Sequence, residues 1–452
     1  MIGVSLSRWT MAYFAVAVAS LLLSESLMIA GYGFPAMAIQ APQTLVLVHI
    51  VAIGWLSFLL CGALFQFVPV LVARSLFSNT LPFPALLFLL AGLAALVTGF
   101  LQLAGTIDFT PSLLPYGAIS LAIGFTLVLY NLGRTLWQAR PLPLQARFVA
   151  VALVCLAATV TLGAIFSFAF GTTVHSEALL AIAGYGLPLH VSAGLGGWLT
   201  FAAIGVSYRL LAMFMLAPEL KGRRPQAVFW LGTAALAVAI LGGLASLLCH
   251  ASVFPALLVG GGLGAVALAL YLADAVHLYR ARKRRIIELN SRMAAFALAS
   301  LAASVVLTVV LLALGRLTQQ VGALVFLVAF GWLSGLGLAK LYKIVAFLTW
   351  LECYGPVLGK KATPRVQDLV VEGRARGWFV VYYLAVWSAT ACLLASQDLA
   401  FRLAAAAMAV ATLAIAAQLV RTRLLSDVPA TARLTEGVGR PHLLICTPSP
   451  NR

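Results

Sequence analysis

Two histidines stand inside long apolar stretches of the sequence, where an ionisable side chain is rare without a role. His49 lies five residues before Gly54, and His190 lies seven residues before Gly197. Imidazole is the usual axial ligand for haem iron and a common ligand for copper. The sequence therefore predicts a haem or metal site at these histidines, with His250 as a further candidate ligand. A neutral histidine bonded to a backbone carbonyl is the alternative.

An acidic side chain lies in the first apolar stretch. Glu25 is placed about two-thirds of the way along it, towards the expected outer face. A carboxyl group at that depth needs a partner or water, so it is a candidate for a functional role. A protonated Glu25 that is hydrogen-bonded to a neighbouring helix is the structural alternative, and both interpretations stay open.

A Gly-Trp-Leu-Ser/Thr motif occurs three times and orders the chain. Its copies begin at Gly54, Gly197 and Gly331, at intervals of 143 residues (54 to 197) and 134 residues (197 to 331). A small residue follows each copy, and then an aromatic and a polar residue: Gly62, Phe65 and Gln66; Gly205, Tyr208 and Arg209; Ala339, Tyr342 and Lys343. A repeat of this length indicates a multi-helix module used three times. It puts Trp55, Trp198 and Trp332 at equivalent intramembrane positions.

The composition identifies the class of protein. Of the 452 residues, 63% are hydrophobic and 9% are charged, which is typical of a polytopic membrane protein. A span needs about 20 apolar residues. Twelve stretches meet this requirement, at about 9–32, 44–71, 83–105, 113–137, 148–171, 187–216, 228–249, 253–279, 294–314, 320–350, 377–395 and 400–420. We therefore expect an all-α fold with twelve transmembrane helices.

The repeat predicts three four-helix modules, because the motif falls on the second, sixth and tenth stretches. The expected modules are 1–139, 140–285 and 286–425, followed by a disordered cytoplasmic tail, 426–452, that is rich in Pro, Thr and Arg. On a regular α-helix, the unequal spacings of His49 and His190 from their motifs place the two histidines about half a turn out of phase.

The net charge of +17 follows the spans and does not indicate nucleic-acid binding. Lys and Arg gather in the loops after even-numbered spans, so the positive-inside rule places both termini in the cytoplasm. The expected location is a bacterial-type cytoplasmic (inner) membrane, with the basic rim against anionic lipids of the inner leaflet. The six cysteines form no CxxC pair and are expected to serve packing.

The sequence also resembles a known superfamily. Twelve expected spans in three modules, with His49 followed by GWLSFLLCGALFQFVPVL, resemble the catalytic subunit I of haem–copper oxidases and the haem-binding NnrS-type proteins related to it. The resemblance implies that His49 ligates a haem b. It implies loosely that His190 corresponds to a copper ligand. A redox partner or another membrane subunit is a further implied partner.

The sequence departs from the oxidases at their oxygen-reducing centre. It has no His-His pair in the seventh span and no His-x-His in the tenth, where Phe326 stands five residues before Gly331. Gly194 occupies the place of the Tyr in the oxidases' His-x-x-x-Tyr motif. We therefore expect a divergent relative that is not a functional terminal oxidase.

Three functions stay open. The first is haem or copper binding in the outer half, for electron transfer, metal handling or a response to nitric oxide. The second is a transporter or channel with Glu25 as its titrating group. The third is a non-catalytic membrane scaffold that binds a partner through the loop at 352–376. A visible absorption spectrum separates the first from the other two.

Overall fold

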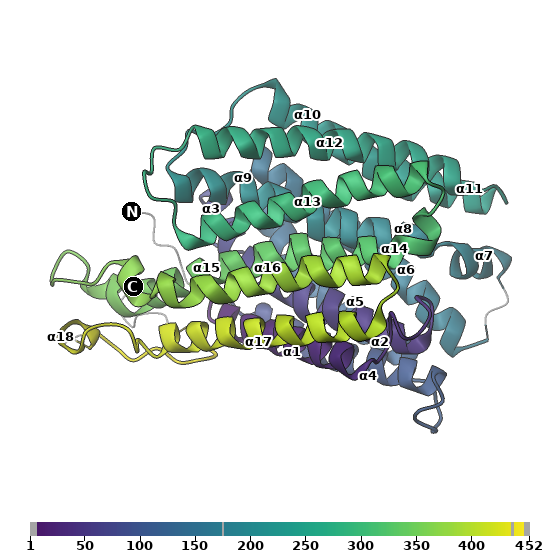
Figure 1. The fold of residues 1–452 in the computed structure, drawn as a ribbon, viewed down its shortest axis with the longest axis horizontal. Helices are drawn as coiled ribbons and strands as arrows, with labels where there is room; N and C mark the ends of the chain where they lie inside the picture. Colours follow the sequence, from purple (N-terminus) through teal and green to yellow (C-terminus); the bar gives the residue numbers. More distant parts are fainter. Residues whose placement is uncertain (1–6, 174–175, 435–437, 447–452) are drawn as a thin grey trace. The chain divides into compact units, whose positions relative to one another are not determined.

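Every regular secondary-structure element of the computed structural model is a helix within the residues that it describes, 7–173, 176–434 and 438–446. Twelve helical spans of these residues are long and apolar enough to cross a membrane, which confirms the predicted fold class. The spans are drawn in Figure 1. In chain order they are α1 (Thr10–Ala30); α2 (Pro42–His49) with η1 (Ile50–Ser57) and α3 (Phe58–Val72); α4 (Pro82–Leu103); α5 (Leu114–Gln138); α6 (Leu144–Gly171); α8 (Leu187–Val191) with η2 (Ser192–Phe201) and α9 (Ala202–Met215); α10 (Arg223–Ala237) with η3 (Val238–Gly242) and α11 (Gly243–Leu248); α12 (Phe254–Arg280); α13 (Leu289–Ala313); α14 (Leu317–Phe326) with η4 (Leu327–Ser334) and α15 (Gly335–Tyr354); α16 (Glu372–Leu394); and α17 (Asp398–Arg423).

Proline marks where several of these helices begin. Five of them carry it at the first or second position, where the missing N–H is not needed and the fixed φ suits a helix: Pro42, Pro82, Pro115, Pro188 and Pro255. The apolar runs that follow satisfy their own backbone groups by remaining helical. A proline at the N-terminus of the helix and a continuous apolar run after it therefore account for the bounds of these spans.

The three copies of the Gly-Trp motif share an unusual local structure. Each lies in a π-helical segment: η1, η2 or η4. A π-helix bonds residue i to i+5, is rare, and usually marks a functional position within an α-helix. The tryptophans Trp55, Trp198 and Trp332 are all buried. The three motif copies are thus alike in backbone form and burial as well as in sequence.

Small residues of the repeat lie where helices approach closely. A Cβ at Gly62 would come within 2.8 Å of the Tyr13 side chain, and one at Gly205 within 2.5 Å of Phe148. Within the motif itself, a Cβ at Gly197 would clash with Cys155 at 2.4 Å. Close contact between membrane helices requires small residues. The small residues that recur in the repeat therefore have a role in helix packing.

The contacts within the chain divide it into two units. Unit 1 comprises Met1–Ile39, Ile53–Gln66 and Ile287–Arg452. Unit 2 comprises Gln40–Ala52 and Phe67–Ile286. The limit near Ile286 falls beside the expected border between the second and third modules, and the border expected at 139–140 lies inside unit 2. The division into three modules stays a prediction.

Each unit has its own helix pairs. In unit 1, α1 packs on α17, α13 packs on α15, and α16 and α17 run side by side after a short turn (Figure 1). In unit 2, α4 packs on α5, α10 on α12, and α6 on both α5 and η2. The pair of α6 and η2 is the one that positions His190.

The tail expected to be disordered is packed in its described part. Val428 of the tail and Leu425 just before it share a buried apolar cluster with Cys353 and Tyr354 of α15 and with Leu369. The short helix α18 (Ala430–Arg433) follows, and the Tyr354 hydroxyl donates to the Arg433 carbonyl at 2.9 Å. Composition did not indicate these contacts, and the disordered tail 426–452 stays a prediction.

Candidate functional site

His49 occupies the end of α2, directly before the π-helical segment η1. Its Nδ1 lies 2.8 Å from the carbonyl oxygen of Leu45, one turn earlier. Because a carbonyl oxygen only accepts, Nδ1 must carry the hydrogen, and the lone pair of the neutral ring is then on Nε2. The ring packs against Phe100 of α4, with centroids 5.0 Å apart. This arrangement of a histidine fixed through Nδ1 is typical of metal ligands that bind through Nε2.

His190 lies in α8, just before η2, and packs against α6. A Cβ at Gly163 would come within 3.1 Å of the ring carbon Cε1, so the imidazole depends on a glycine at that position. The Phe166 ring contacts it edge-on, with centroids 5.5 Å apart. Its Nδ1 is buried without a hydrogen bond to the described residues; the Thr159 backbone lies close by, outside hydrogen-bond geometry.

The two histidines lie in the same unit of the structure. Both belong to unit 2, and their rings are close enough to interact electrostatically. The half-turn offset expected from their spacings assumed 3.6 residues per turn. The segments between the histidines and their motifs are largely π-helical, and a two-residue difference in spacing is close to half a turn there too. The pairing of His49 with His190 stays a prediction.

His250 is placed differently. It is exposed in the turn after α11, with a φ of 54°. His49 and His190 are partly buried, with their rings against Phe100 and Phe166, whereas His250 is exposed. His175 lies outside the described residues.

The donor set suits some cofactors better than others. Among the described residues, no group of three or more His, Cys, Asp or Glu side chains is placed to hold a metal ion. Blue-copper centres and catalytic zinc sites use at least three protein ligands. Two imidazoles are enough for a haem iron, which already has four ligands from its macrocycle. The arrangement therefore fits haem better than copper.

The other predicted intramembrane residues lie in unit 1 or elsewhere in unit 2. Glu25 is fully buried in α1 of unit 1. Trp55, also of unit 1, donates from Nε1 to the Ser334 hydroxyl at 2.7 Å, and this hydroxyl donates to the Ala329 carbonyl. Trp198 is buried in η2 of unit 2, and Trp332 in η4 of unit 1.

Several buried charges were missed in the sequence. Asp274 of unit 2 is 2% exposed and accepts from the Tyr208 hydroxyl at 2.9 Å and from Arg224 at 3.3 Å. Lys340 of unit 1 is buried on α15, next to the matched residue Ala339. The position of Lys340 inside an apolar run of the sequence could have identified it as a buried charge.

A buried ion pair in unit 1 was also missed. Arg423 and Glu352 lie 2.8 Å apart, and both side chains are 4% exposed. The same guanidinium donates to Thr349 and to the carbonyl groups of His442 and Ile445 in the tail. The two partners are 71 positions apart, so one sequence alone does not pair them.

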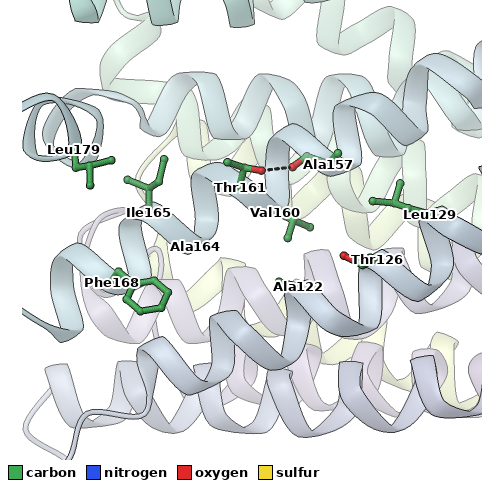
Figure 2. A pocket seen from close by; sticks show the side chains of 10 residues that line it. All are labelled: Ala122, Thr126, Leu129, Ala157, Val160, Thr161, Ala164, Ile165, Phe168 and Leu179. Carbon is green, nitrogen blue, oxygen red and sulfur yellow. Dashed lines mark hydrogen bonds between the residues drawn. The ribbon is translucent and has the colours of Figure 1, made fainter.

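Unit 2 also has a hollow of about 470 Å³ between α5, α6 and α7 (Glu177–Tyr185). Figure 2 shows its lining, which is apolar apart from Thr126 and Thr161. The Thr161 hydroxyl donates within its own helix, to the Ala157 carbonyl at 2.9 Å. Helical spacing places this lining on a different face of α6 from Gly163. The hollow therefore offers no ligand for a metal and is separate from the histidine pair.

No protein-family model matches the chain, and a comparison with curated proteins finds no significant match.

Proposed function

We propose that this polytopic membrane protein binds haem b through His49 and His190 of unit 2 and serves electron transfer or a response to nitric oxide. The observation that carries the proposal is the pair of intramembrane imidazoles, each placed just before a π-helical Gly-Trp segment and close enough to interact. The superfamily resemblance adds support for His49. We place the protein in a bacterial-type cytoplasmic membrane, with anionic lipids at its basic rim and a redox partner or second membrane subunit.

The cost of burying polar atoms supports a ligand at this site. A buried polar nitrogen without a hydrogen bond costs about 1–3 kcal/mol. The Nδ1 of His190 is such an atom, and the ring is held between Phe166 and the space that Gly163 leaves. Coordination of a metal by this Nδ1 would offset part of the cost.

The chain's residues give each histidine a distinct task. Leu45 accepts the Nδ1 hydrogen of His49 and fixes its tautomer and orientation. Gly163 leaves room for the His190 ring, and Phe100 and Phe166 supply apolar surfaces of the kind that pack against a macrocycle and exclude water. A bound haem supplies one-electron chemistry, and the protein tunes it through these ligands and their low-polarity surroundings.

The test is the visible spectrum of the purified protein after expression with a haem precursor and copper both supplied. Wild type is expected to show a Soret band with a haem-to-protein ratio near one. His190→Ala is expected to lose or alter the band, and His49→Gly to lose it. His250→Ala is the matched control, because His250 is exposed, and should keep the wild-type spectrum.

Loss of folding is separated from loss of a ligand by chemical rescue. Free imidazole added to His49→Gly should restore the band, because it can occupy the space of the missing ring. Size-exclusion chromatography checks that each variant is intact. Wild-type protein that carries neither haem nor copper under these conditions would refute the proposal and favour the transporter or scaffold alternatives. If metal analysis found copper without haem, the proposed cofactor would be copper instead of haem.

A further inference from the structure

Glu25 presents a buried carboxyl group that has only one hydrogen-bond partner in the described structure. Its side chain is 0% exposed in α1 of unit 1. Oε1 accepts from the Thr412 hydroxyl of α17 at 2.8 Å. Oε2 is buried and makes no hydrogen bond to the described residues. An ionised carboxylate would need donors at both oxygens, and this one has a donor at one.

The charged and titratable groups around Glu25 do not neutralise it. Tyr382 of α16 is within electrostatic range, but its hydroxyl already donates to the Phe330 carbonyl at 3.0 Å. Arg402 of α17 donates from Nε to the Ile29 carbonyl at 2.8 Å, at the end of α1. Its guanidinium lies over Gly31 and is therefore held between one and two turns beyond Glu25. None of the ion pairs of the described residues includes Glu25.

Glu352 provides a comparison within the same unit. It is also buried, with its side chain 4% exposed, but Arg423 lies 2.8 Å from its Oε2. A buried carboxylate with a guanidinium partner can stay ionised, whereas a buried carboxylate without a cation is destabilised by several kcal/mol and takes up a proton instead. Unit 1 therefore contains two buried carboxyl groups in opposite electrostatic settings.

We propose that Glu25 is an intramembrane proton-binding site, with the proton on Oε2 and the Thr412 hydroxyl donating to Oε1. The proposal accounts for both oxygens. The carbonyl oxygen of a carboxylic acid accepts a hydrogen bond, and its other oxygen carries the proton. Tyr382 links this site to the π-helical segment η4, since its hydroxyl is bonded to Phe330 there. Intramembrane carboxyl groups of this kind bind and release protons in pumps and transporters.

The proposal is independent of haem binding. Glu25, Thr412 and Tyr382 belong to unit 1, and the histidine pair belongs to unit 2. Glu25→Gln is accordingly expected to keep the Soret band of wild type, and His190→Ala to keep the protonated carboxyl group. Failure of one proposal is thus visible without failure of the other.

Infrared difference spectroscopy of the full chain in lipid tests whether Glu25 is protonated. A protonated buried carboxyl group gives a carboxylic C=O stretch, separate from the amide bands. This band is expected at neutral pH in wild type, and its loss is expected in Glu25→Gln, whose amide is a neutral isostere and should preserve the fold. Thr412→Val should shift the band to higher frequency, because the carbonyl oxygen loses its donor. Absence of a band that depends on Glu25 overturns the proposal.

A membrane-permeant carbodiimide gives a second readout with Glu352 as internal control. The protonated carboxyl group adds across one C=N bond: its oxygen bonds to the central carbon, and its proton moves to a nitrogen. The acyl group then shifts from oxygen to nitrogen, so the stable N-acylurea contains all atoms of both reactants. Mass spectrometry should find the adduct at Glu25 and not at Glu352. An adduct at Glu352 with none at Glu25 would contradict the assignment of a protonated Glu25 and an ionised Glu352.

Discussion

At the scale of single residues, the candidate haem site depends on the lack of a side chain at Gly163 as much as on the two imidazoles. Gly163 lies on α6 where the His190 ring passes over it. A methyl group there would approach Cε1 to 3.1 Å, which is closer than ordinary van der Waals contact. Gly133 of α5 offers a matched position, because a Cβ there meets nothing within 4 Å. Both glycines sit inside helices of unit 2.

Gly163→Ala is therefore expected to turn His190 away from its present position and to weaken haem binding. Residues that orient a metal ligand typically contribute about 10–100-fold to affinity, and we expect a loss in that range. Haem titration of the apoprotein, followed at the Soret band, measures it. Gly133→Ala should bind haem as wild type does. Equal affinities for the two variants would mean that Gly163 does not position His190.

At the scale of elements, the sequence predicted the spans well and the local geometry poorly. Apolar length and proline position determine where a membrane helix runs, so the twelve spans agreed with the structure. The π-helical turns were missed, because the apolar pattern of one sequence does not distinguish them from α-helix, and neither does it show contacts such as Trp55 with Ser334, far apart in the chain. The pairing of His49 with His190 was suggested by residue type and stays a prediction.

The tail illustrates the same limit. Asp427 follows α17 directly and accepts from Arg421 at 2.7 Å and from Arg374 of α16 at 3.0 Å. These guanidinium groups, Arg421 first, hold the pKa of Asp427 below its ordinary value. A polar tail was expected to be disordered, because composition does not show which charges find partners. Buried Val428 and Leu425 flank this carboxylate.

The depressed pKa gives a pH dependence with a definite sign. The contribution of Asp427 to stability is fully present above its unfolded pKa of about 3.9 and is lost as pH falls through the lower folded pKa. The unfolding temperature of wild type should therefore exceed that of Asp427→Asn by a constant amount from neutral pH down to about pH 5. In stronger acid the two should converge. Curves that stay parallel into strong acid would exclude this role for Asp427.

At the scale of the whole molecule, the distribution of charge predicts the orientation of the chain. Reporter fusions after Asp108, Glu177 and Ala251 should be active outside, and fusions after Arg140, Arg224, Arg284 and Lys361 should be active inside. The physical reason is the excess of Lys and Arg in one set of loops. A systematic reversal would invert every expected depth, including the outer placement of Glu25, His49 and His190.

One contact of unit 1 has a consequence for biosynthesis. The backbone N–H of Cys446 donates to the Arg8 carbonyl at 2.9 Å, and Arg423 holds the carbonyl groups of His442 and Ile445 beside it. The ribosome makes these tail residues after the twelfth span, whereas Arg8 precedes the first. The contact can therefore close only once every span has been synthesised. A chain whose synthesis stops before these tail residues leaves Arg423 and Arg8 without these partners.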